Sequence, residues 1–143
     1  MKKVWSLVVM MALTSMIYAQ NAGDIVGVWL TEGGKSKVEV IKKDGKYQGK
    51  IIWLKTPNRE DGTAKLDKEN EEESLRKRPI LGMELIKDFE WDEDIFEDGT
   101  IYDPENGKVY SCEITFENKD TLNVRGYIGF SLLGRTTVWT RVK

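Results

Sequence analysis

The 143-residue sequence contains no histidine. Imidazole is the common general base near neutral pH and a frequent ligand of zinc and haem iron, so its absence excludes Ser-His-Asp and Cys-His sites and every His-ligated metal centre. The remaining carboxylates, tyrosines, lysines and serines form no recognisable catalytic grouping. We therefore predict that the protein is not an enzyme and that it uses no cofactor.

Cysteine is almost absent as well, since Cys112 is the only one. A single thiol cannot form an internal disulfide, a zinc knuckle or an iron-sulfur cluster. Cys112 lies on the apolar face of an alternating segment, which predicts a buried thiol and not a nucleophile. The acidic stretch 84–98 lacks the spacing of a calcium loop, so no metal site is expected.

The sequence has no excess of basic charge. Twenty-two lysines and arginines stand against 24 acidic residues, which gives a net charge of −2 and a pI near 5.4. Surfaces that bind nucleic acid usually carry a basic excess. We therefore expect no nucleic-acid partner.

Long hydrophobic runs are absent except at the start of the chain. Lys2 and Lys3 precede the apolar stretch 4–18, and Ala19 is the small residue that signal peptidase favours at its cleavage site. A membrane-spanning helix needs about 20 apolar residues, so this stretch is short for a span. We predict a signal peptide over 1–19, cleavage after Ala19, a single domain over 20–143 and a secreted or periplasmic location without a membrane span.

Helical periodicity is rare after residue 25, where apolar and polar residues alternate instead. This two-residue period is typical of strands with one buried face. Tyr110, Cys112, Ile114 and Phe116, for example, share one face of such a segment. The alternation predicts eight strands, near residues 25–31, 36–42, 46–54, 80–89, 98–103, 108–117, 120–128 and 134–142.

The connections between these strands favour antiparallel order. Asp44-Gly45 and Asn106-Gly107 suit tight hairpin turns, and there is no room for parallel crossovers. Only the polar segment 55–79 is long; we expect one or two helical turns there, and a lid or flap. Eight short antiparallel strands bury their edges most completely by closing, so the sequence predicts an all-β, up-and-down, eight-stranded barrel.

Two short motifs lie at the ends of this predicted barrel. Gly27-Val28-Trp29 begins the first strand, and Trp139-Thr140-Arg141 closes the last one. A glycine two residues before a tryptophan permits close packing, and an arginine from the last strand can lie flat on the indole ring. We predict that Gly27, Trp29 and Arg141 hold the closed end. The arrangement resembles the calycin superfamily, the lipocalins and fatty-acid-binding proteins.

Further motifs resemble a narrower family over nearly the whole chain after residue 19. They are GVWLT (27–31), GKIIWL (49–54), LRKRPILG (75–82), GTIYDP (99–104), RGYIG (125–129) and GRTTVWTR (134–141). Together they are similar to the bacterial family called domain of unknown function 2147, small exported proteins with a lipocalin-like barrel. The resemblance implies the fold and the export. It implies no catalytic residues, because the family has no established activity.

Candidate ligand contacts are the aromatic residues with polar tips and two arginines. Such aromatics line binding cavities as often as they fill cores. The arginines lie on neighbouring predicted strands and either face solvent or point inward, where they would meet an acidic ligand with forked hydrogen bonds. The candidate cavity residues are Trp53, Tyr102, Arg125, Tyr127, Arg135 and Trp139.

Two functions are consistent with these features. In the first, an exported barrel binds a small apolar or amphipathic ligand, such as a fatty acid, in its interior. In the second, the barrel is packed solid and serves as a structural or interaction module whose partner is another envelope protein. The interior volume distinguishes them, because ligand pockets usually measure roughly 300 to 1,000 Å³.

Overall fold

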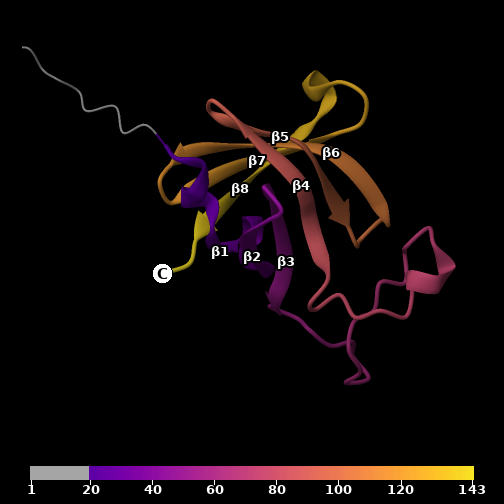
Figure 1. The fold of residues 1–143 in the computed structure, drawn as a ribbon. Helices are drawn as coiled ribbons and strands as arrows, with labels where there is room; N and C mark the ends of the chain where they lie inside the picture. Colours follow the sequence, from indigo (N-terminus) through magenta and orange to yellow (C-terminus); the bar gives the residue numbers. More distant parts are fainter. Residues whose placement is uncertain (1–19) are drawn as a thin grey trace, which may run out of the picture.

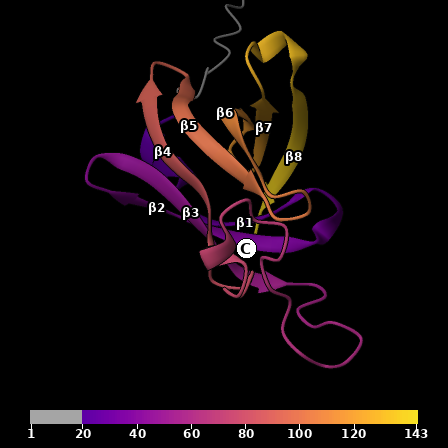
Figure 2. The same cartoon turned by 90° about the vertical axis from the view of Figure 1, so that its right-hand side faces the viewer.

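Eight antiparallel strands close into one barrel in the computed structural model, which describes residues 20–143. Each strand pairs with the next along the chain and the last pairs with the first, so the strands follow one another around a common axis (Figure 2). They are β1 (Gly27–Leu30), β2 (Ser36–Lys43), β3 (Lys46–Leu54), β4 (Glu84–Asp92), β5 (Ile95–Asp103), β6 (Lys108–Asn118), β7 (Thr121–Tyr127) and β8 (Arg135–Arg141). The predicted all-β, up-and-down, eight-stranded barrel is confirmed. The predicted signal peptide, 1–19, lies outside the described residues.

The strand boundaries differ from the expected ones mainly around β4 and β5. β4 begins at Glu84 and not near residue 80, because a turn precedes it in which Met83 N donates to Ile80 O at 3.2 Å. β4 and β5 then extend into a hairpin whose turn includes Glu93 at φ 54°. The residues before β1 form a 3-10 turn, η1 (Ala22–Ile25). None of the helices within 20–143 is long and apolar enough to cross a membrane.

Aromatic rings fill the half of the interior where β1, β3, β5 and β7 begin. The Phe96 ring lies 5.1 Å from that of Tyr47, 4.5 Å from that of Trp91 and 5.9 Å from that of Phe116, measured between ring centroids. These tilted and edge-to-face contacts are the favoured geometry for aromatic pairs. Cys112 is buried nearby in the core, and burial raises the pKa of its thiol to about 12. The predicted buried thiol is confirmed.

The barrel closes along a very short seam. β1 has four residues and pairs with β8 through only Trp29–Arg141 and Leu30–Thr140. One further backbone hydrogen bond, from Val142 N to Val28 O at 2.9 Å, extends the seam. In Figure 1 this seam lies on the left, near η1 and the C-terminus, whereas the long connection after β3 and the β7–β8 connection project on the right.

Side chains reinforce this seam. The guanidinium carbon of Arg141 lies 4.3 Å from the centroid of the Trp29 ring, and Trp29 is fully buried. Arg141 also donates hydrogen bonds to the carbonyl oxygens of Asp24 and Lys119 and pairs with the Asp120 carboxylate at 3.2 Å. One cation therefore ties β8, η1 and the β6–β7 turn to the ring that plugs the closed end.

Gly27 is required by the same contact. Its φ of 142° lies in a region that L-residues with side chains rarely adopt. A Cβ atom at this position would also lie 3.2 Å from Nη1 of Arg141, closer than an ordinary van der Waals contact. The glycine of the first motif thus makes room for the arginine of the last strand.

We expect substitutions at Trp29 and Arg141 to have non-additive effects on the free energy of unfolding, because both remove the same contact. Trp29→Ala should lower the free energy of unfolding by about 3 to 5 kcal/mol, the usual cost of deleting a large buried aromatic side chain. Arg141→Ala should cost about 1 to 2 kcal/mol, through lost stacking and packing. Denaturant unfolding of both single variants and the double variant measures the coupling. Strict additivity would show that the stacked pair does not hold the seam.

Candidate functional site

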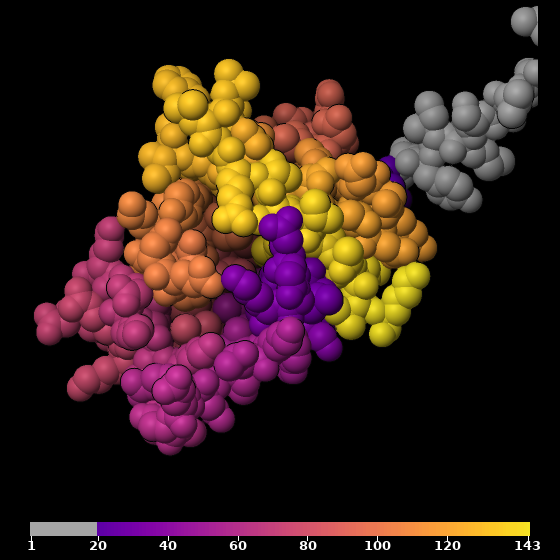
Figure 3. Space-filling view, turned by 180° about the vertical axis from the view of Figure 1, so that it is seen from behind, coloured from indigo at the N-terminus to yellow at the C-terminus, as the bar shows by residue number. Residues whose placement is uncertain are grey.

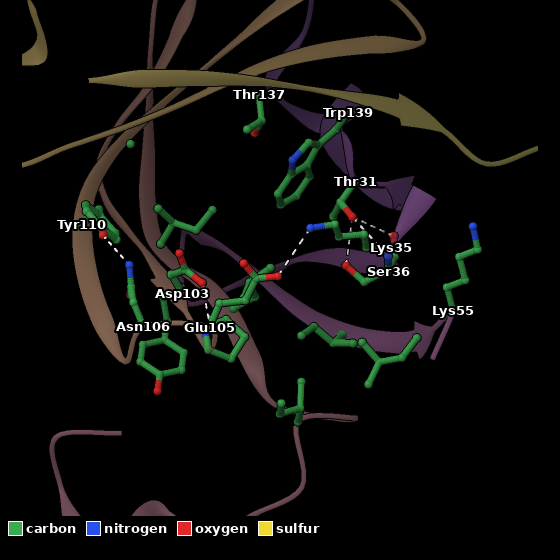
Figure 4. A pocket seen from close by; sticks show the side chains of 18 of the residues that line it. Thr31, Lys35, Ser36, Lys55, Asp103, Glu105, Asn106, Tyr110, Thr137 and Trp139 are labelled. Carbon is green, nitrogen blue, oxygen red and sulfur yellow. Dashed lines mark hydrogen bonds and ion pairs between the residues drawn. The ribbon is translucent and has the colours of Figure 1, made fainter. Parts of the chain in front are cut away.

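The other half of the barrel contains a cavity of about 730 Å³ (Figure 4). It lies where β1, β3, β5 and β7 end, the end opposite the Trp29–Arg141 seam. Its size falls within the usual range for ligand pockets, roughly 300 to 1,000 Å³. The alternative function assumes a barrel that is packed solid along its whole length, and this cavity does not match that assumption.

The cavity has an apolar wall and a polar rim. Ile51, Leu54, Leu85 and Ile101 contribute aliphatic surface from β3, β4 and β5. The rim is formed by the connections and by the strand ends, and its charged members are four cations and two carboxylates: Lys35, Lys55, Lys65, Arg135, Asp103 and Glu105. An apolar interior below a mainly cationic rim is suited to a molecule with one apolar and one polar end.

An ion pair crosses the mouth of this cavity. Lys35 Nζ lies 3.4 Å from Glu105 Oε1, and the two side chains come from the β1–β2 and β5–β6 connections (Figure 4). Both side chains are largely exposed, which makes this pair weak. It therefore presents little barrier to a ligand that enters between the two connections.

Three of the predicted cavity residues line the wall: Tyr102, Arg135 and Trp139. Arg135, Thr137 and Trp139 alternate along β8, so all three lie on its inner face, and Arg141 continues this face at the closed end. The Trp139 indole is directed into the pocket (Figure 4). Trp29 Nε1 donates to Ile25 O at 2.8 Å. Trp139 Nε1 makes no hydrogen bond within 20–143, and because no buried side-chain donor there lacks a partner, its N–H is accessible from the cavity. This N–H is a free donor inside the cavity.

Trp53 does not face the interior, so that prediction of its orientation was wrong. Simple alternation from Tyr47 through Gly49 and Ile51 would turn Trp53 inward. The pairing of β2 with β3 shifts register at this point, with Val38 opposite Ile51 but Lys37 opposite Trp53, and the resulting bulge reverses the alternation. Trp53 is consequently 39% exposed under the Lys37 ammonium, and the next residue, Leu54, lines the cavity instead.

Arg125 and Tyr127 also lie outside the cavity, contrary to the prediction that they face a common interior. On β7 the inward positions are taken by Leu122 and Val124, which are buried. Arg125 Nε donates to Ser131 O at 2.7 Å, and its Nη1 donates to Thr136 Oγ1 at 2.9 Å. Arg125 and Arg135 therefore do not form an inward-pointing pair.

The long connection between β3 and β4, residues 55–83, forms part of the cavity wall and is fastened to the barrel. Its Asp67 side chain is fully buried and accepts hydrogen bonds from Tyr102 Oη at 2.5 Å, Asn70 Nδ2 at 2.9 Å and Arg78 Nε at 2.9 Å. The Arg78 guanidinium also stacks over the Tyr102 ring at 5.6 Å. The segment expected to be a lid is thus held against the barrel by a buried carboxylate. Its helical content is one 3-10 turn, η3 (Glu73–Leu75).

A second contact fixes the same connection to the β5–β6 turn. Gly107 is buried and has a φ of 75°. A Cβ atom there would overlap the Glu69 carbonyl oxygen, because the chain at Glu69 and Asn70 passes directly over the turn. The predicted hairpin turn at Asn106-Gly107 is confirmed, and its glycine also provides space for the long connection.

The comparisons with known proteins agree with this geometry. The family described as "Uncharacterized protein conserved in bacteria (DUF2147)" matches residues 27–141. The chain belongs to the DUF2147 family. It is also similar to a solved structure, protein HP1028 from the human pathogen Helicobacter pylori, which is described as belonging to the lipocalin family. The two chains are 24% identical, 83% of each is covered, and the TM-score is 0.73, which shows a shared fold. A comparison with curated proteins gave no match.

The DUF2147 motifs noted in the sequence now have structural positions. LRKRPILG supplies Arg78 to the Asp67 cluster, and GTIYDP supplies Tyr102. Asp67 itself was missed, because nothing in its own neighbourhood marks it as buried. Thr137 was missed although alternation with Trp139 along β8 would have placed it inside. Within 20–143, no three acidic or cysteine side chains converge as a metal site would require.

We expect the Tyr102 hydroxyl to hold the 55–83 connection in place. Tyr102→Phe should lower the free energy of unfolding by about 1.5 to 3 kcal/mol, the usual range for a hydrogen bond to a charged group. It should also speed amide hydrogen exchange between residues 55 and 83. Tyr127→Phe is the matched control, since its hydroxyl makes only a 3.4 Å contact with Glu113 on the outer wall. Equal effects of the two variants would contradict this role.

Ionisation of Tyr102 should lower the stability of the protein at alkaline pH. Burial, followed by the hydrogen bond to Asp67, raises the pKa of Tyr102 from 10.0 to about 12. As the pH rises, the Tyr102 hydroxyl therefore loses its proton in the unfolded chain before it does so in the folded protein. The stabilisation that Tyr102 contributes to the folded state is complete below pH 10 and declines as the pH rises to about 12. Unfolding measured across this range should show a steeper alkaline loss for the parent than for Tyr102→Phe. Parallel curves would disprove the linkage.

Proposed function

We propose that the protein is an exported carrier that binds a small, largely apolar ligand in the cavity at the open end of the barrel. The single observation that carries the proposal is the cavity of about 730 Å³ with an aliphatic wall. A lipocalin-like fold is compatible with this use. The motif at the start of the chain supports export, because Lys2, Lys3, the apolar stretch 4–18 and Ala19 have the pattern of a signal peptide.

The shape and the polarity of the site favour an amphipathic ligand. Aromatic packing around Phe96 occupies the far half of the barrel, so a ligand has to be short or slender. A fatty acid fits this description: each methylene removed from water contributes about 0.8 kcal/mol, before the losses of immobilisation. Its carboxylate would lie at the rim, near Lys35, Lys55 and Lys65.

The donor of Trp139 adds a directional requirement. Trp139 is only 2% exposed and lines the cavity, and its Nε1 makes no hydrogen bond within 20–143. An alkyl chain lying over this N–H would remove water from it without replacing the hydrogen bond, so a ligand that places an oxygen there gains affinity over a plain alkyl chain. Hydroxylated or carbonyl-containing chains should therefore bind more tightly than saturated chains of equal length.

Binding can be tested by displacement of a fluorescent fatty-acid analogue with fatty acids and the matched alcohols. The parent protein should bind the analogue at micromolar concentration, about −8 kcal/mol. Trp139→Phe keeps an aromatic ring but removes the donor, so it should reduce the preference for oxygenated chains. Lys55→Gln should weaken the binding of acids more than the binding of alcohols, because it removes only a charge at the rim.

Trp53→Phe is the matched control, since Trp53 lies on the outer wall. This variant should bind every ligand as the parent does. Absence of binding at high micromolar concentration would refute the carrier function. Equal loss in the Trp53 and Trp139 variants would show that the analogue binds elsewhere on the protein.

A further inference from the structure

The β7–β8 connection exposes a cluster of large apolar side chains. The segment 126–134 carries no charged residue, although 32% of the chain is charged, and it is flanked by Arg125 and Arg135. Four of its large apolar side chains are strongly exposed: Ile128 62%, Phe130 76%, Leu132 90% and Leu133 77%. We name these four residues the apolar tip. Exposed apolar clusters of this kind mark interaction sites on soluble proteins.

The apolar tip has a defined conformation. Arg125 Nε donates to Ser131 O at 2.7 Å, and residues Ser131–Leu133 form a 3-10 turn, η4. At the base of the connection, a Cβ atom on Gly134 would lie 2.6 Å from Gly126 O, so the two strands approach closely there. The connection therefore stands out from the barrel as a folded projection, seen as the gold segment at the upper left of Figure 3.

The cationic rim shares one end of the barrel with the apolar tip. In an up-and-down barrel the β1–β2, β3–β4 and β7–β8 connections all lie at the same end, so Lys35, Lys55 and Lys65 surround the mouth beside which the tip projects. Lys35 pairs with Glu105, and Arg135 pairs with Glu32 at 3.7 Å. Lys55 and Lys65 have no carboxylate partner within 4 Å in 20–143.

We propose that this end of the barrel docks on an anionic phospholipid surface, with the apolar tip inserted among the lipids and the lysines of the rim against the phosphates. A convex apolar projection buries its side chains in a deformable medium without needing a matching groove. Tyr127 and the two flanking arginines supply the side chains that prefer the boundary between lipid and water. Lys55 and Lys65 supply the charge complementarity to anionic headgroups.

Docking in this orientation would place the cavity mouth at the lipid surface. Gly126 and Arg135, at the base of the apolar tip, both line the cavity. An apolar molecule could then pass between lipid and cavity with little exposure to water. The docking proposal does not depend on the carrier function, because the tip and the rim would bind lipid whether or not the cavity is filled.

Vesicle flotation with the purified protein tests the docking. Vesicles of phosphatidylcholine with phosphatidylglycerol should bind the parent, and vesicles of phosphatidylcholine alone should bind it more weakly. Replacing Phe130, Leu132 and Leu133 together with serine should reduce binding by about tenfold or more, because these side chains would no longer leave water on docking. Lys55→Gln combined with Lys65→Gln should reduce only the preference for phosphatidylglycerol, and added salt should do the same.

The matched control is Val26→Ser with Ile41→Ser, which removes exposed apolar side chains near the closed end. This double variant should bind vesicles as the parent does. The proposal is overturned if the parent binds neither vesicle, or if the triple serine variant binds as well as the parent. Concentration-dependent self-association of the parent that the triple variant loses, without vesicle binding, would assign the apolar tip to a second copy of the chain.

Discussion

The fold depends on closing an eight-stranded sheet along a seam that has very few backbone hydrogen bonds. β1 is only four residues long and pairs with β8 at two positions. The Arg141 guanidinium compensates by stacking on the buried Trp29 ring and bonding carbonyl groups on both sides of the seam. Gly27 leaves the space that this cation occupies. Without this contact the seam would be held only by its few backbone pairs.

Closure at one end and aromatic packing behind it leave the other end of the barrel free to be hollow. The rings around Phe96 supply dense apolar burial in one half, so the other half can accommodate a cavity without loss of the core. The 55–83 connection then completes the cavity wall, and the buried Asp67 holds it against Tyr102 and Arg78. A buried carboxylate with three donors is costly to disrupt, which makes this connection a fixed wall. The site proposed for a ligand is therefore built on rigid elements.

Much of the fold and less of the site could be predicted from the sequence. Strict alternation and turn residues located all eight strands, because a strand with one buried face is encoded by neighbours two residues apart. The prediction for Trp53 failed where β3 carries a bulge, since a bulge depends on pairing with a second strand. Arg125 and Tyr127 were misassigned, although the alternation along β7 places them on the other face of the strand from Leu122 and Val124. Asp67 could not be found, because its partners Tyr102 and Arg78 are distant in sequence.

The sequence by itself determined the architecture: local periodicity, turn chemistry and the motifs at Gly27, Trp29 and Arg141 are sufficient to define an eight-stranded barrel and its closed end. The tertiary structure alone decided which half of that barrel is hollow, which side chains line the cavity and which apolar residues stay exposed at Ile128, Phe130, Leu132 and Leu133. The physical reason is the range of the interactions. Strand periodicity arises between near neighbours, whereas a cavity and an exposed apolar tip depend on how distant segments fill or leave the same space.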